Sequence, residues 1–114
     1  MNLAEKIEES VKRRRVGVSF VELLEDVPEI KGEYAYFIGG TKICIWPSLT
    51  EEACQAIWLL MNNGKIHPKT CAPLVYLVDG KYPTLPLAKQ RRQYKEPHWL
   101  PVTFQYGPAP WLKV

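Results

Sequence analysis

Cysteine is scarce in this chain of 114 residues, and no long apolar run occurs in it. The three cysteines, Cys44, Cys54 and Cys71, are odd in number and have no CxxC spacing, which argues against a disulfide framework and a zinc ribbon. No apolar stretch approaches the roughly 20 residues of a membrane helix, and the N-terminus has no basic-then-apolar signal pattern. We therefore expect a cytoplasmic protein without a membrane partner.

Motifs of catalysis and cofactor binding are also missing. The chain contains no GxxxxGK[ST], GxGxxG or HExxH, and Gly39-Gly40-Thr41-Lys42 lacks the spacing and the strand-to-helix setting of a phosphate loop. His67, Cys71, His98 and Cys54 are the metal-ligand candidates, but no second pair accompanies His67 and Cys71. A cysteine nucleophile lacks a third, orienting group. The sequence predicts no enzyme, no metal site and no cofactor.

The overall composition is that of an ordinary globular domain. Hydrophobic residues make up 46% of the chain and charged residues 24%, and its length fits one core. The formal net charge of +3 is too small to indicate a polyanionic partner by itself. The charge is unevenly distributed, because residues 19–33 carry −4 and residues 65–95 carry +6. The chain is electrically bipolar along its length.

Capping boxes indicate where three helices begin. Each pairs a Ser or Asn with a Glu three residues later, and the pairs are Asn2 with Glu5, Ser19 with Glu22, and Ser48 with Glu51. They predict a helix that ends near Arg15, a second over about 20–26, and a third over 49–63 that stops at Gly64.

Strand signals lie between and after these helices. Aromatic and β-branched residues within 33–46 flank Gly39-Gly40-Thr41, a pattern that predicts a β-hairpin. Residues 65–66 and the apolar run 74–78 favour strands, and 99–106 favours an edge strand.

Together these signals predict a fold of the α+β class. We expect a small single domain over 1–106, made of three short helices with β-hairpins. Six prolines follow position 82, and a Pro/Trp tail over 107–114 completes the chain.

Residues 51–80 combine an apolar helix, a glycine that ends it, and an apolar run that closes in a turn. The residues concerned are Ala53, Ala56, Leu60, Asn63-Gly64-Lys65-Ile66, Pro73-Leu74-Val75-Tyr76-Leu77 and Asp79-Gly80. This segment resembles the winged-helix DNA-binding proteins, in which a helix enters the major groove and a hairpin, the wing, touches the flanking backbone. The resemblance implies groove-facing polar residues in 50–63, and wing residues Lys65, His67 and Lys69.

Basic clusters give a physical reason to expect a nucleic-acid partner. Four cations fall within residues 89–95, beside glutamines and a tyrosine that can donate to phosphate or stack on a base. We predict non-catalytic, regulatory binding of double-stranded DNA, with phosphate contacts from Arg13, Arg14, Arg15, Lys65, Lys69, Lys89, Arg91, Arg92 and Lys95. The competing interpretations are a solvated surface for 89–95 and helix-dipole stabilisation for 12–15.

A protein-interaction module is the alternative function. Such an adaptor, inhibitor or self-associating domain would use the acidic face over 22–33 or the Pro/Trp tail. Trp99 and Trp111 are the candidate partner-binding residues, because both stand between prolines or beside one, where large rings dock at low entropic cost. Packing of these rings within their own domain is the competing interpretation.

Overall fold

Polar side chains cap the three longer helices, α1 (Leu3–Arg14), α2 (Phe20–Asp26) and α3 (Glu51–Asn62). The structure is a computed structural model that describes residues 1–78, 80, 83–89 and 94–109. Asn2 and Ser19 form the predicted capping boxes, and Gly64, with φ of 71°, follows the end of α3. The predicted box at Ser48 is wrong, because Ser48 lies in a strand; the Thr50 hydroxyl caps α3 instead.

The predicted hairpin is confirmed and belongs to a three-stranded sheet. Strands β1 (Lys31–Phe37) and β2 (Ile43–Leu49) are antiparallel, and the short strand β4 (His98–Trp99) pairs with β2 in parallel. A 3-10 turn, η1 (Pro28–Ile30), connects α2 to β1.

A second sheet is formed by segments far apart in the sequence. Strand β3 (Ile66–Thr70) pairs in antiparallel register with β5 (Val102–Tyr106), which confirms a strand in the last part of the chain. Val18 and Phe104 exchange backbone hydrogen bonds of 2.9 and 2.8 Å, so a single residue between α1 and α2 extends this sheet on the other side of β5. The order across the sheet is therefore residue 18, β5, β3.

The apolar run at 74–78 is not a strand. It contains the one-turn helix α4 (Leu74–Leu77), whose first turn closes on the Pro73 carbonyl oxygen through the N–H groups of Tyr76 and Leu77. The hairpin expected within 65–78 therefore does not form, since β5 takes the place beside β3. Asp79, in the predicted turn dipeptide, lies outside the described residues.

Five aromatic rings connect the helices to both sheets. The Phe20 ring stacks on Trp46 at 5.2 Å and meets Phe104 edge-on at 5.3 Å, while Tyr76 contacts Trp46 at 5.4 Å and Trp99 at 5.2 Å. The buried Tyr76 hydroxyl donates to the Val102 carbonyl at 2.6 Å and accepts from the Phe20 N–H at 3.0 Å. This network holds α4 and the connection between β3 and β5 to the core.

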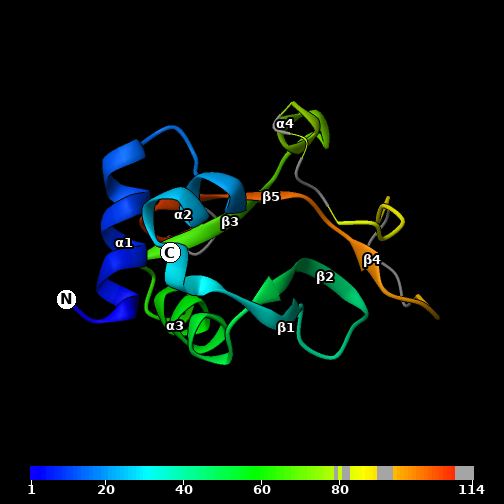
Figure 1. Cartoon of the computed structure of the whole chain (residues 1–114), viewed down its shortest axis with the longest axis horizontal. Coiled ribbons are helices and arrows are strands. Elements are labelled where there is room, and N and C mark those ends of the chain that lie inside the picture. Colours follow the sequence, from blue (N-terminus) through cyan, green and yellow to red (C-terminus); the bar gives the residue numbers. More distant parts are fainter. Residues whose placement is uncertain (79, 81–82, 90–93, 110–114) are drawn as a thin grey trace.

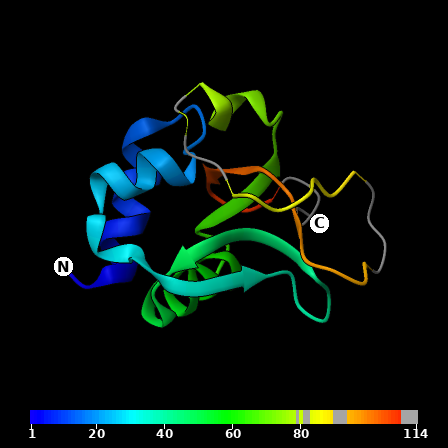
Figure 2. The same ribbon diagram turned by 45° about the vertical axis from the view of Figure 1, so that its right-hand side comes forward.

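The elements divide into a helical end and a sheet end. Helices α1, α2 and α3 gather on one side in Figure 1, and the β1–β2 hairpin with β4 extends away from them. Figure 2 shows β5 and β3 between α4 and the hairpin, with α4 standing apart from α1 and α3. The described part of the predicted tail is attached to β3, because the Gly107 N–H donates to the Lys65 carbonyl at 2.7 Å and Ala109 is buried.

Candidate functional site

The basic end of α1 faces the acidic side of α2. The Arg14 guanidinium contacts both carboxylate oxygens of Asp26 at 2.8 Å and reaches Glu22 at 2.9 Å, while Arg13 lies 2.9 Å from Asp26. Ser10 also donates to Asp26, at 2.6 Å. The hydrogen bonds from Arg14 hold the pKa of Asp26 well below its usual range, and those to Asp26 raise the pKa of Arg14. These two arginines therefore tie α1 to α2.

The acidic face over 22–33, predicted as a docking surface, is partly paired with cations of α1. Asp26 and Glu22 are paired with Arg14, and Glu29 accepts a 2.6 Å hydrogen bond from Lys6, which lowers the pKa of Glu29. Charges already satisfied within a chain offer little to a partner.

Lys69 pairs with one edge of strand β5, and Arg15 closely precedes Val18, which pairs with the other edge. Residues on β3 and β5 alternate, so that Lys69, His67, Thr103 and Gln105 share the face turned away from the core. Gly17, just after Arg15, approaches the Thr103 and Gln105 side chains so closely that an added Cβ would lie 2.6 Å from Gln105 Nε2. Two exposed cations predicted to touch phosphate thus border one polar sheet face.

The segment from Tyr94 to Trp99 is held to the β1–β2 hairpin by a lysine side chain. Lys42 Nζ donates to the Lys95 carbonyl at 2.8 Å, and the Tyr94 ring stacks on His98 at 3.8 Å. Lys89, like Lys95, is exposed. Lys65 is exposed at the start of β3, whereas the predicted contacts Arg91 and Arg92 lie outside the described residues.

Helix α3 has none of the charge expected of a helix that reads DNA. Its outward residues include Glu51, Glu52 and Gln55, and it exposes 56% of Trp58 and 46% of Leu59. Arginine and lysine are the common partners of guanine edges and phosphates, and α3 contains neither.

Helix α4 exposes its apolar side chains rather than burying them. Leu74, Val75, Leu77 and Val78 are 63, 42, 46 and 78% exposed, and Tyr76 between them is fully buried. We call these four residues the apolar α4 surface. Sequence reasoning missed it, because an apolar run is the usual signal of a buried strand.

Of the two candidate partner-binding tryptophans, the structure describes Trp99 alone. Trp99 is 2% exposed and packs edge-on against Tyr76, so it belongs to the core rather than to a partner surface. Trp111 lies outside the described residues.

The pKa values of all three cysteine thiols are raised in this fold. Burial raises the pKa of the Cys44 thiol to about 11 and also raises the pKa values of Cys54 and Cys71, which keeps the reactive thiolate scarce near neutral pH. Within the described residues, no three metal-ligating side chains converge. No helix in that part of the chain has the length and apolar character to cross a bilayer.

Comparison of the chain with protein-family models, curated proteins and solved structures gives no match.

Proposed function

We propose that this chain is a small, non-catalytic, winged-helix-like domain that binds double-stranded DNA through the connection between β3 and β5 and the polar sheet face beside it. The phosphate contacts come from Arg15, Lys65, Lys69, Lys89, Arg91, Arg92 and Lys95. Arg13 and Arg14 are left out of this set, because the acids of α2 already pair with them.

The main support for the proposal is the order of the segments. With η1, β1, β2, α4 and β4 set aside, the remaining elements follow the order helix, single-residue strand, helix, helix, strand and strand, and the sheet order is residue 18, β5, β3. This reduced order resembles that of winged-helix domains, whose wing is the connection between the last two strands. Here that connection spans 71–101, and the basic run 89–95 falls within it.

The β1–β2 hairpin is an addition to the pattern, between α2 and α3. In a winged-helix protein another helix normally comes just before the recognition helix, whereas here the hairpin comes just before α3. Because α3 also lacks cations and exposes Trp58 and Leu59, we assign the binding energy to the wing and the polar sheet face.

Fluorescence anisotropy of a labelled random duplex of about 20 base pairs, at about 50 and about 200 mM salt, tests the proposal. With about six phosphate contacts, the affinity should fall roughly 10³-fold between the two salt concentrations. The matched single variants are Lys69→Ala, which should weaken binding, and Lys6→Ala, whose ammonium pairs with Glu29 and which should not. Absence of binding at the lower salt concentration, with a folded protein, would refute the proposal.

Self-association is a second candidate function, and the apolar α4 surface favours it. Four neighbouring apolar side chains that remain exposed are more than scattered surface residues, and such patches commonly mark protein contacts. Light scattering during size exclusion should then show a dimer that Leu74→Ser with Val78→Ser converts to a monomer. A wild-type monomer at all accessible concentrations would exclude this candidate.

A further inference from the structure

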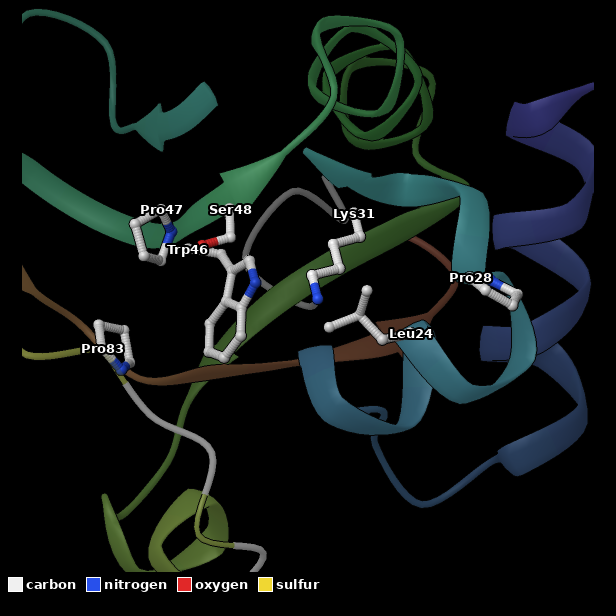
Figure 3. A pocket seen from close by; sticks show the side chains of 7 residues that line it. All are labelled: Leu24, Pro28, Lys31, Trp46, Pro47, Ser48 and Pro83. Carbon is white, nitrogen blue, oxygen red and sulfur yellow. The ribbon is translucent and has the colours of Figure 1, made fainter. Parts of the chain in front are cut away.

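A pocket of about 410 Å³ lies between α2, the β1–β2 hairpin and the connection that follows α4. This volume lies within the range of small-molecule sites. Its walls are mainly apolar, formed by Leu24, Pro28, Pro47 and Pro83, with the Trp46 ring (Figure 3). The polar groups of its lining are few and come from Lys31, Ser48 and the Trp46 indole.

Two hydrogen-bond donors of this pocket, the Trp46 indole N–H and the Lys31 ammonium, point toward the same space (Figure 3). Trp46 is only 6% exposed, and its Nε1–H is buried and has no hydrogen-bond partner in the described part of the chain. Figure 3 shows the indole nitrogen and the Lys31 ammonium directed toward the same space. An unpaired buried donor costs free energy, and an anionic oxygen between the two groups would satisfy both.

The charge of the lining agrees with an anionic ligand. Lys31 is the one charged residue among the seven that line the pocket, and no carboxylate stands among them. Within the described residues Lys31 forms no ion pair, unlike Lys6 and Arg14 nearby in the helical end. Its stem is flexible and exposed, so the ammonium can move to admit a ligand.

We propose that this pocket binds a small organic carboxylate with an apolar body, its carboxylate bridging Lys31 Nζ and Trp46 Nε1–H. The hydrophobic body lies against Leu24 and the prolines. The site is independent of the proposed DNA contacts, none of which lines the pocket.

The test is a titration of the full chain, labelled with ¹⁵N and without DNA, followed by the indole N–H signals in NMR spectra. The probes are phenylacetate, its neutral analogue phenylacetamide, inorganic phosphate, and an N-acetylated tripeptide that ends in a free phenylalanine carboxylate. A fragment of this size should bind with a dissociation constant on the order of 1 mM. Phenylacetate should shift the Trp46 Nε1–H signal downfield and saturably.

Variants of Lys31 distinguish a carboxylate site from an apolar hollow. Lys31→Met should weaken phenylacetate binding about tenfold or more, Lys31→Arg should retain it, and Lys42→Met, outside the pocket, should leave it unchanged. Tighter binding of the tripeptide would assign the carboxylate to a peptide C-terminus, and tighter binding of phenylacetate to a free acid. No shift at about 10 mM of either acid, an equal shift with the amide or with phosphate, or an unaltered titration in Lys31→Met overturns the proposal.

Discussion

The two basic runs of this chain, residues 12–15 and 89–95, have similar composition but differ in whether acidic residues lie beside them. At the end of α1, Arg13 and Arg14 face three acids on α2, and their charge is used within the fold. In the connection from β3 to β5, Lys89 and Lys95 are exposed, and neither ammonium forms an ion pair in the described residues. A run of cations therefore indicates a binding partner only where acidic residues of the same chain do not pair with it in the fold.

The difference has an electrostatic cause. Asp26 is only 13% exposed at its side chain and receives hydrogen bonds from Arg14 and Ser10, so this pair is partly shielded from water. Shielded, bidentate pairs stabilise a fold more than exposed pairs such as Lys6 with Glu29. The exposed side chains of Lys89 and Lys95 are open to water, which the proposed release of counterions from DNA requires.

Removing the acid at the centre of the α1–α2 contact should have the largest effect on stability. Asp26→Ala leaves Arg14 with its best partner missing and should lower the free energy of unfolding by about 3 kcal/mol. Urea denaturation measures the change. Glu29→Ala is the control, and its midpoint should match that of the wild type; equal losses in both variants would show that the Asp26 contacts are not special.

The hydroxyl of Tyr76 should come next, because it connects α4 and β5 to the start of α2. Tyr76→Phe keeps the ring but leaves the Phe20 N–H and the Val102 carbonyl without this partner, which should cost about 2 kcal/mol. Thermal denaturation with Tyr36→Phe as control separates this loss from a general effect of removing a hydroxyl. An unchanged melting temperature would contradict the assigned network.

Acid should weaken the α1–α2 contact by a smaller, graded amount. The pKa of Asp26 is lower in the folded chain than in the unfolded one, so its contribution is complete above about pH 4 and is lost as the pH falls below that value. Between pH 4 and pH 3 the loss from this group should be about 1 kcal/mol. Urea midpoints of the wild type and Asp26→Asn should converge over this range, and parallel pH profiles would contradict the assignment.

Local signals in the sequence predicted most of the helices and the hairpin. Asn2, Ser19 and the Gly39-Gly40 turn act on neighbours a few residues away, so their effect is visible in the sequence. The cap of α3 was misplaced by two residues because Ser48 and Thr50 both offer a hydroxyl, and only the strand register excludes Ser48.

Long-range pairing could not be predicted in the same way. An apolar run of five residues fits a strand or a short helix equally well. Within 74–78 the short helix α4 forms, because the place beside β3 is taken by β5, which lies more than thirty positions further along the chain. The Arg14–Asp26 contact depends on how α1 packs against α2. The pocket follows the same rule, since Trp46 and Lys31 come to line one space only in the folded chain.

The most direct test of the account compares two double variants that remove equal charge from the two runs. Arg91→Ala with Arg92→Ala should weaken duplex binding about tenfold or more at low salt and reduce the salt slope by about 2, without changing the melting temperature. Lys12→Ala with Arg13→Ala should change the affinity less than about threefold, because these residues lie outside the proposed contact set. Equal losses of affinity in the two double variants, or a larger loss in the second, would contradict the account.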